Sequence, residues 1–266
     1  MCMNEYLPFP VEIVEIIKHT AIERTFRIAY AGANQVKPGQ FFQLSIPMVG
    51  EAPISVSGIG KDVIDFTIRK VGKVTNEVFE RAVGDKLFVR GPYGNGFDVE
   101  LYKDKELIIV AGGTGLSPVR GVVDYFANNL DQVKSFKLII GFKTPADVLF
   151  KADIASWERK FDVLLTVDEA DETYVGHKGF VTDLIPDLEI NRLADVAVIV
   201  VGPAMMIHFT VQAFLKRNVA KERIWISQER HMSCGIGKCG HCKIDDVYIC
   251  LDGPVFNFTK GELLID

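Results

Sequence analysis

Short runs of β-branched and other apolar residues alternate with turn residues along the first hundred positions. The runs cover residues 11–17, 25–29, 41–46, 63–68 and 86–89. Short strands at such regular spacing are typical of a small antiparallel barrel, and the stretch 76–81 fits one short helix. The pattern therefore predicts an all-β domain over residues 1–100.

The pattern changes after residue 106, where apolar runs alternate with stretches of helical periodicity. These runs are 107–111, 136–141, 163–167, 196–201 and 224–226. Strands that alternate with helices form a parallel sheet, so residues 101–226 are predicted to form a Rossmann-like α/β domain. Neither period persists beyond residue 227, and the segment 227–266 is rich in glycine and cysteine. We predict a small irregular lobe there, organised by something other than an apolar core.

Composition and charge exclude several classes of function. The chain has 266 residues, of which 48% are hydrophobic, and this suits two compact domains. No stretch approaches the roughly 20 apolar residues of a membrane span, and the N-terminus lacks the features of a signal peptide, so we expect a soluble, cytoplasmic protein. The formal net charge of -5 argues against a nucleic-acid partner, because such proteins usually carry a basic stripe.

Four of the five cysteines fall close together near the C-terminus. Cys234, Cys239, Cys242 and Cys250 have the spacing C-x4-C-x2-C-x7-C, which is that of the ligands of plant-type [2Fe–2S] clusters. Glycines between them allow the backbone to curl so that amide N–H groups point at the sulfurs. Structural zinc, held by thiolates alone or with a nearby histidine, remains the alternative. A redox-active dithiol at the C-x2-C pair is disfavoured, because that motif normally follows an early strand.

A glycine-rich segment follows the apolar run 107–111 and precedes a helical stretch. It contains Gly112, Gly113, Thr114 and Gly115. Exposed amides at a helix N-terminus favour an anionic group, and glycines permit its close approach. The segment lacks the full G-x-G-x-x-G fingerprint, so an ordinary tight turn is the alternative.

A second loop of the same kind follows the run 196–201 and contains Gly202, Pro203 and Met206. Ligands of open parallel sheets bind beyond the carboxyl ends of the strands, where both loops are expected to lie. The two loops are therefore predicted to flank one nicotinamide dinucleotide.

Candidate contacts to a flavin lie in the predicted barrel. Ser55 can bond a ribityl or phosphate oxygen, and the amides before the short helix can hold a pyrophosphate. Serine and threonine are also common at strand ends and helix caps for structural reasons, so both interpretations stay open. The candidate residues are Pro53, Ile54, Ser55, Val56, Arg69, Gly72, Val74 and Thr75.

Taken together, these residues resemble the ferredoxin-NADP reductase superfamily, and within it the electron-transfer subunits that end in a [2Fe–2S] lobe. The resemblance spans the whole chain and is also carried by the segments 91–97, 229–242 and 250–256. Such subunits occur in dihydroorotate dehydrogenase, in sulfhydrogenases as their gamma subunit, and in anaerobic sulfite reductase. We favour the electron-transfer subunit of anaerobic sulfite reductase on length and overall similarity, and the other two are the alternatives.

The resemblance implies FAD on a six-stranded barrel, NAD(P)H on the second domain and a [2Fe–2S] cluster on the lobe. It also implies a separate catalytic subunit, here one that reduces sulfite to sulfide, with a further ferredoxin-like subunit as an option. The family's flavin motif usually opens with Arg where this chain has Ala52, so Arg69 or Lys70 is expected to neutralise the phosphate. Many relatives have Cys where Val201 stands, but hydride transfer depends on proximity rather than on that thiol.

The choice of nicotinamide can be argued from charge. The run 163–167 leads into an acidic segment that begins at Asp168. Carboxylates accept hydrogen bonds from ribose hydroxyls and repel a 2′-phosphate, so we expect NADH to be preferred, with NADPH the second choice. A solvated acidic loop is the alternative. At the level of function, a zinc-stapled interaction module and a stand-alone flavin reductase remain as other classes.

Overall fold

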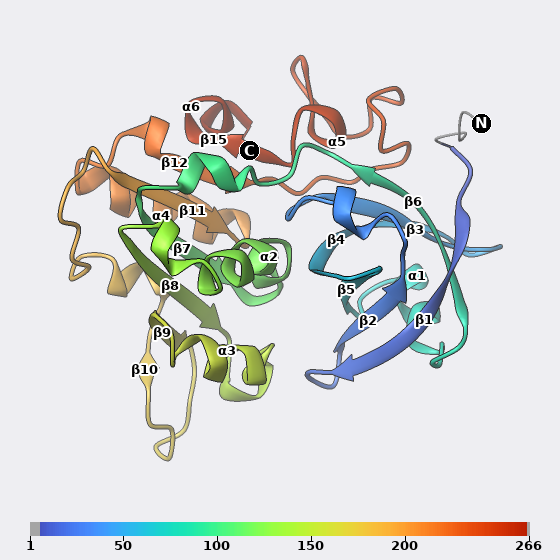
Figure 1. The fold of residues 1–266 in the computed structure, drawn as a ribbon, viewed down its shortest axis with the longest axis horizontal. Coiled ribbons are helices and arrows are strands. Elements are labelled where there is room, and N and C mark those ends of the chain that lie inside the picture. The colour runs from blue at the N-terminus through green and yellow to red at the C-terminus, as the bar shows by residue number, and fades with distance from the viewer. Residues whose placement is uncertain (1–5, 265–266) are drawn as a thin grey trace. The chain divides into compact units, whose positions relative to one another are not determined.

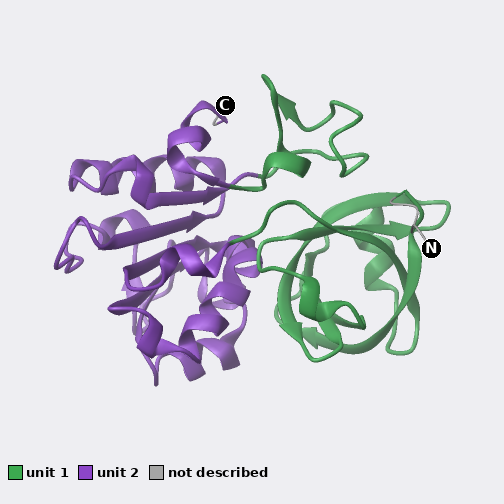
Figure 2. Cartoon of the chain, turned by 45° about the horizontal axis from the view of Figure 1, so that its top comes forward, with its two compact units in different colours: residues 1–97, 229–255 green, residues 98–228, 256–266 purple. Residues whose placement is uncertain are grey.

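The computed structural model describes residues 6–264, and the chain divides into two compact units (Figure 2). Unit 1 comprises residues 1–97 and 229–255, and unit 2 comprises residues 98–228 and 256–266. The N-terminal unit thus includes the cysteine-rich segment, while the extreme C-terminal segment belongs to the α/β unit. The three domains proposed from the sequence, with their bounds at 100 and 226, stay a prediction.

Unit 1 is built on a closed barrel with the strand order β1-β2-β5-β4-β3-β6, in which all neighbours are antiparallel (Figure 1). This confirms the predicted six-stranded barrel. The elements are β1 (Phe9–Lys18), β2 (Glu23–Ala29), β3 (Phe41–Ile46), β4 (Gly50–Gly60), β5 (Val63–Arg69), α1 (Lys73–Phe79) and β6 (Lys86–Tyr93).

The barrel interior is filled by alternate residues of each strand. On β3, for example, Phe42, Leu44 and Ile46 are all buried in the barrel core. Because side chains of a strand point alternately to its two faces, the residues between these three face the outside of the barrel. The outer face of β3 and its neighbours is the surface on which the candidate site is built.

Unit 2 contains a seven-stranded sheet in the order β10-β9-β8-β7-β11-β12-β15. Its pairings from β10 to β12 are parallel, as the alternation of strands and helices predicted. The strands are β7 (Glu106–Gly112), β8 (Ser135–Phe142), β9 (Asp162–Val167), β10 (His177–Lys178), β11 (Val196–Val201), β12 (Ile224–Ser227) and β15 (Val255–Asn257). The helices are α2 (Leu116–Ala127), α3 (Lys151–Trp157), α4 (Ala204–Lys216) and α6 (Phe258–Gly261).

The order of these strands reverses at β7. From β7 the chain proceeds to β8 and β9 on one side, and it then returns to place β11 and β12 on the other side of β7. In open α/β sheets such a reversal creates a crevice at the carboxyl ends of the two strands that flank it. The loops after β7 and β11 therefore stand at the position where this fold accepts a ligand.

The cysteine-rich segment has little regular structure, as expected. Its elements are β13 (Lys243–Ile244), β14 (Val247–Tyr248) and α5 (Ile249–Asp252). Beyond it the structure differs from the expectation of an irregular end, because β15 joins the edge of the parallel sheet and α6 follows. The reason is apolar burial, since Phe256 and Phe258 are both 3% exposed.

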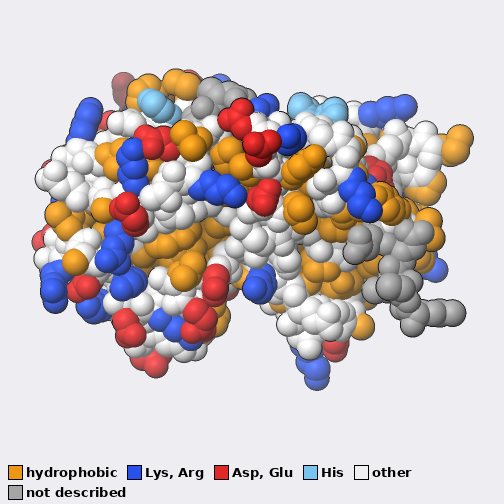
Figure 3. Space-filling model, turned by 90° about the horizontal axis from the view of Figure 1, so that it is seen from above, with side chains coloured by type: hydrophobic (Ala, Val, Ile, Leu, Met, Phe, Trp, Pro, Cys, Tyr) orange, Lys and Arg blue, Asp and Glu red, His pale blue; other side chains and the backbone are white. Residues whose placement is uncertain are grey.

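Two features of the whole chain bear on its partners. Among residues 6–264, no helix combines the length and the apolar character needed to cross a membrane. On the face drawn in Figure 3, acidic and basic side chains are intermixed. That face therefore presents no broad surface of a single charge.

Candidate functional site

The segment around the four cysteines forms a cradle of amides. The Cys234 Sγ atom accepts hydrogen bonds from the amides of Ile236, Lys238 and Cys239, at 3.5, 3.3 and 3.4 Å. The amide of Gly237 donates to Cys250 Sγ at 3.1 Å. This confirms the expectation that amides point at the sulfurs. Donors of this kind stabilise thiolates and any negatively charged group that the thiolates hold.

The thiols act most strongly on one another as two pairs, Cys234 with Cys239 and Cys242 with Cys250, and Cys234 has a weaker effect on Cys250. Burial raises the pKa of Cys234, but the amide hydrogen bonds outweigh it and lower the pKa to about 6. For Cys250, burial and then the neighbouring Cys242 thiol raise the pKa to about 12. Cys239 is exposed, whereas Cys242 and Cys250 are buried.

The paired arrangement can be tested against the two metal groups that the spacing allows. Within the described part of the chain, no three His, Cys, Asp or Glu side chains converge closely enough to hold a single metal ion. A structural zinc ion requires four ligands arranged as a tetrahedron about one point. Two pairs of thiols suit a group with two metals and two thiolates on each, as in a [2Fe–2S] cluster. The described residues are compatible with such a cluster.

Arg90 fastens the cysteine-rich segment to the barrel. Its guanidinium donates to the carbonyl oxygen of Ser233 at 2.7 Å and also to that of Cys234. The same guanidinium pairs with the Glu51 carboxylate at 2.6 Å and donates to Tyr93 Oη at 3.3 Å. Burial alone would lower the pKa of Arg90, but the hydrogen bond to Glu51 raises it, so the guanidinium stays charged. The Glu51 carboxylate in turn has a lowered pKa, chiefly because of its hydrogen bond to Arg90.

A bulge brings the residues of this anchor to one face. In the pairing of β3 with β6, Phe41 lies opposite Tyr93 and Gln43 lies opposite Arg90. One residue separates these positions on β3 and two separate them on β6, so β6 carries one extra residue. Without it, Arg90 and Tyr93 would point to opposite faces of the strand. With it, both side chains lie on the outer face of the barrel, against the segment that carries Cys234.

A second anchor holds the other end of the cysteine-rich segment. The side-chain amide of Asn95 donates to the carbonyl oxygens of Asp252 and Val255, at 3.0 and 2.7 Å. The backbone amide of Asn95 donates to the carbonyl oxygen of Gly253 at 2.7 Å. The loop that follows β6 therefore fixes the chain just beyond Cys250.

The predicted flavin motif lies on β4, beside β3. Pro53 pairs with Gln43, and Ser55 pairs with Phe41, so these two motif residues share the outer face with the Arg90 anchor. Ile54 packs against the barrel core instead, and Val56 is buried in it. The motif and the cysteine-rich segment thus occupy neighbouring parts of one barrel face.

The other flavin candidates already have partners within the chain. Arg69 forms an ion pair with Glu23 at 2.6 Å, and Glu23 is 2% exposed. Thr75 Oγ1 accepts from the amides of Val71 and Gly72, at 3.0 and 2.9 Å, and so caps α1, in which Val74 is the second residue. Thr75 therefore acts as a helix cap, which is one of the two interpretations that the sequence left open.

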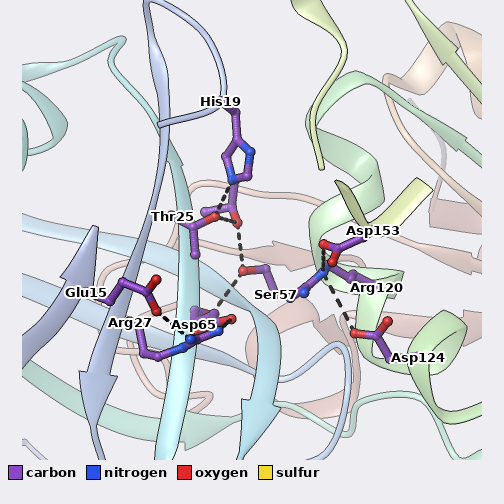
Figure 4. A network of polar contacts seen from close by, with 10 residues as sticks. Glu15, His19, Thr25, Arg27, Ser57, Asp65, Arg120, Asp124 and Asp153 are labelled. Carbon is purple, nitrogen blue, oxygen red and sulfur yellow. Dashed lines mark hydrogen bonds and ion pairs between the residues drawn. The ribbon is translucent and has the colours of Figure 1, made fainter. Parts of the chain in front are cut away.

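Polar side chains of the barrel wall beside this face form a connected network (Figure 4). Thr67 Oγ1 donates to Ser57 Oγ and bonds to Thr25 Oγ1, both at 2.7 Å. In the same wall, Arg27 bonds to Asp65 at 2.8 Å. The network keeps the buried polar groups of these strands satisfied.

The two glycine-rich loops of unit 2 lie side by side, as predicted. The strands that precede them are direct neighbours, with Ala111 paired to Val201. A Cβ atom on Gly115 would stand 2.6 Å from the carbonyl oxygen of Val201, so only glycine allows this approach. Met206 fills the space beside the loops, because a Cβ atom on Gly112 would meet its sulfur at 2.3 Å and one on Gly202 would meet its methyl group at 2.6 Å.

The remaining members of these loops begin the two helices. Gly113 and Thr114 form a short 3-10 turn with Gly115 that leads into α2, and Pro203 precedes α4. Asp168 is exposed directly after β9. Partial burial, and then the charge of Glu169, raise the pKa of Asp168, against the opposing effect of Lys143. The Asp168 carboxylate therefore takes up a proton more readily than that of an ordinary aspartate.

Sequence reasoning missed three residues of the site, Gln43, Glu51 and Arg90. They belong to no motif, and their common face arises from strand pairing and the bulge. The one feature of the sequence that could have indicated this face was Gln43, a polar residue in the middle of the apolar run 41–46.

Comparison with known proteins finds two family models. Residues 109–212 match the oxidoreductase NAD-binding domain, and residues 229–260 match the iron-sulfur cluster binding domain of dihydroorotate dehydrogenase B. The chain is 33% identical to the gamma subunit of sulfhydrogenase 1 of Pyrococcus furiosus, over 96% of this chain and 92% of that protein. It is also 33% identical to the probable electron transfer subunit of dihydroorotate dehydrogenase B (NAD(+)) of the same organism, over 94% and 93%.

Among solved structures, the chain is similar to that of an NADH-dependent reduced ferredoxin-NADP oxidoreductase, studied for flavin-based electron bifurcation. The TM-score is 0.79 and the identity 24%, over 96% of this chain and 91% of that one. At this identity the likeness shows the fold alone. The fold is that of the ferredoxin reductases, with a small additional iron-sulfur segment.

Proposed function

The chain belongs to the family of NAD-dependent electron-transfer subunits with a ferredoxin-reductase-like fold and a C-terminal iron-sulfur domain, and we propose that it carries electrons from NADH, through FAD and a [2Fe–2S] cluster, to a separate catalytic subunit. One observation carries this proposal. The cysteine-rich segment and the predicted flavin motif occupy neighbouring parts of the same outer barrel face in unit 1. Electron transfer between two groups depends on such closeness.

The proposed cluster ligands are Cys234, Cys239, Cys242 and Cys250. The amides around Cys234 and Cys250 donate to the sulfurs, and this favours the more negative, reduced form of the group. Arg90 orients the segment through the carbonyl oxygens of Ser233 and Cys234. Zinc is the second candidate, but the absence of a single-metal arrangement in the described residues disfavours it.

For the flavin, we propose contacts from the β4 motif and from the start of α1. The residues are Pro53, Ile54, Ser55, Val56, Arg69, Gly72, Val74 and Thr75. Because Glu23 already neutralises Arg69, the phosphates must rely on backbone amides more than in relatives that have Arg where this chain has Ala52. When bound, a flavin accepts a hydride as a pair of electrons and releases the electrons singly.

For the nicotinamide, we propose that the two loops at the reversal of the sheet order hold it. The residues are Gly112, Gly113, Thr114, Gly115, Gly202, Pro203 and Met206. Backbone amides of the first loop would bind phosphate, while Met206 limits the width of the crevice. Asp168 would accept from the ribose hydroxyls and so favour NADH.

The proposal for the catalytic partner rests on the kinds of complex to which the relatives belong. The sulfhydrogenase and dihydroorotate dehydrogenase relatives described above favour a partner of one of these two kinds. A catalytic sulfite reductase partner, which the sequence led us to prefer, is a second candidate that neither of these relatives supports. We propose, for all three, that the partner accepts electrons from the cysteine-rich segment of unit 1.

The proposal is tested by anaerobic purification followed by metal, sulfide and flavin analysis. We expect about two irons, two acid-labile sulfides and one flavin per chain, with a visible spectrum that shows both chromophores. A colourless protein that contains zinc would overturn the proposal. Purification from the native cell would identify the partner through the protein that copurifies.

A further inference from the structure

Gln43 is a buried amide without a partner. It lies in the middle of β3 and is 0% exposed, and neither Oε1 nor Nε2 has a hydrogen-bond partner among the described residues. Burying such a group without a partner costs about 1–3 kcal/mol. Such orphaned groups are few in native proteins, and a functional role or a bound group outside the chain is among the reasons for which they are kept.

The other buried polar side chains of the described barrel strands have hydrogen-bond partners. Thr25, Ser57 and Thr67 satisfy one another within the wall, as described above (Figure 4). Among the described residues, Gln43 is the one side chain in which two buried polar atoms lack partners. The missing hydrogen bonds of Gln43 are therefore explained by its position and not by poor packing of the barrel.

That position is the outer face of β3, beneath the cysteine-rich segment. Phe42 and Leu44 on either side point into the barrel core, so Gln43 points outward. The Cγ atom of Gln43 lies 3.6 Å from the point that a Cβ atom on Gly235 would occupy, and Gly235 follows Cys234 directly. The opposite neighbour on β6 is Arg90, whose guanidinium holds the Cys234 carbonyl oxygen.

We propose that the Nε2 amide of Gln43 donates a hydrogen bond to the iron–sulfur group held on the Cys234 side, and thereby raises its reduction potential. The inference rests on the proposed function. Sulfur atoms of such a group accept hydrogen bonds, and the bond is stronger in the reduced form because that form carries more negative charge. The same amide would otherwise remain unsatisfied, so the group and the residue stabilise each other.

The decisive variant is Gln43→Met, which removes the N–H donor but keeps the length of the side chain. The midpoint potentials of the cluster and the flavin are measured by anaerobic redox titration, followed by EPR and visible absorption. We expect the ratio of reduced to oxidised cluster at a fixed ambient potential to fall about tenfold, which is about 59 mV for a one-electron couple. We expect the flavin potential to stay unchanged.

Leu44→Met is the matched control, since it lies next to Gln43 on the same strand, conserves volume and points into the core. It should leave both potentials unchanged. A cluster potential in Gln43→Met equal to that of the wild type, or a shift confined to the flavin, would overturn the inference. A wild-type protein without a cluster would instead overturn the proposed function, so the two failures are distinguishable.

A second measurement covers the case in which Gln43→Met does not load a cluster. Wild-type protein is labelled with 15N in its glutamine side chains, reduced, and studied by pulsed EPR. We expect a 15N coupling to the reduced cluster, since a direct hydrogen bond places Nε2 next to a sulfur atom. A spectrum without any such coupling would contradict the inference, whatever the behaviour of the variant.

Discussion

At the scale of single residues, Arg90 decides whether the cysteine-rich segment stays on the barrel. Its side chain is 6% exposed and bonds both to Glu51 and to two carbonyl oxygens of the segment. A guanidinium presents several donors in one plane, which lysine cannot reproduce. Replacement of Arg90 therefore leaves the partly buried carbonyl oxygens of Ser233 and Cys234 and the Glu51 carboxylate without this partner.

We expect Arg90→Met to lower the free energy of unfolding by about 2 kcal/mol, because unpaired acceptors and a lone carboxylate remain. Chemical denaturation followed by circular dichroism measures this loss, and the iron content of the purified variant should also fall. Arg192→Met is the control, since Arg192 is 74% exposed and its pair with Asp195 should contribute little. Equal stabilities for the two variants would show that the anchor contributes nothing.

Asp168 should set the choice between the two nicotinamides. Asp168→Asn removes the charge that repels a 2′-phosphate, and we expect the ratio of kcat/KM for NADPH to that for NADH to rise about tenfold. Asp171→Asn is the control, because the Asp171 carboxylate is engaged by Thr173 at 2.5 Å in the same loop. An unchanged ratio in Asp168→Asn would assign the ribose contact to another residue.

The same residue predicts a pH dependence. Burial and Glu169 raise the pKa of Asp168, so its carboxylate becomes protonated at a higher pH than that of an ordinary aspartate. Discrimination against NADPH should therefore be complete at neutral pH and should weaken as the pH falls through this raised pKa. Kinetics with both nicotinamides between about pH 4 and about pH 7 would show it, and a ratio independent of pH would count against the role.

Residues within compact motifs could be predicted from the sequence, and residues brought together by strand pairing could not. The spacing of Cys234 to Cys250 and the loops after β7 and β11 are local patterns. Gln43 and Arg90 are separated by many residues, and their common face depends on the register of β3 with β6 and on its bulge. No pattern within either strand encodes that register.

At the scale of elements, the spacing of β7 and β11 depends on glycine. Gly115→Ala would place its Cβ atom 2.6 Å from the Val201 carbonyl oxygen, so the loop must shift away from β11. We expect NADH binding to weaken about tenfold, while iron and flavin contents stay unchanged. Fluorescence or calorimetric titration with NADH measures the affinity.

Gly113→Ala serves as the comparison within the same loop. A Cβ atom there meets nothing within 4 Å, although the φ angle of 55° imposes a cost of about 1 kcal/mol. Its effect on NADH binding should be smaller than that of Gly115→Ala. The reverse order would contradict the steric explanation.

Most elements could be predicted from apolar periodicity, and the exceptions have identifiable causes. The run 196–201 is β11 itself, because a buried parallel strand is apolar on both faces. β4 was not recognised, since its buried residues are the consecutive Val56, Ser57 and Gly58 rather than alternate ones, and its sequence is rich in glycine and serine and contains a proline. α1 begins at Lys73, earlier than predicted, because Gly72 and Thr75 cap it. β15 is three residues long, too short to show a period.

At the scale of the whole molecule, the two units have different proposed tasks. Unit 2 carries the loops proposed to bind nicotinamide, and unit 1 carries both the flavin motif and the cysteine-rich segment. The isolated chain should therefore accept electrons from NADH but lack a substrate that could act as the final electron acceptor. A catalytic partner would supply that substrate.

We accordingly expect the isolated chain, without oxygen or an added acceptor, to consume NADH only until its own groups are reduced. A flavin takes two electrons and a [2Fe–2S] cluster one, so consumption should stop at about 1.5 NADH per chain. Absorbance at the NADH band measures it. Continued consumption under these conditions would show that the chain completes a reaction by itself.

EPR spectroscopy of the anaerobic protein, before and after addition of NADH, tests the path from nicotinamide to cysteines most directly. The account predicts no cluster signal before NADH and a spin-1/2 signal of about one spin per chain after it. A cluster that dithionite reduces and NADH does not, or a protein that never shows the signal, would contradict it.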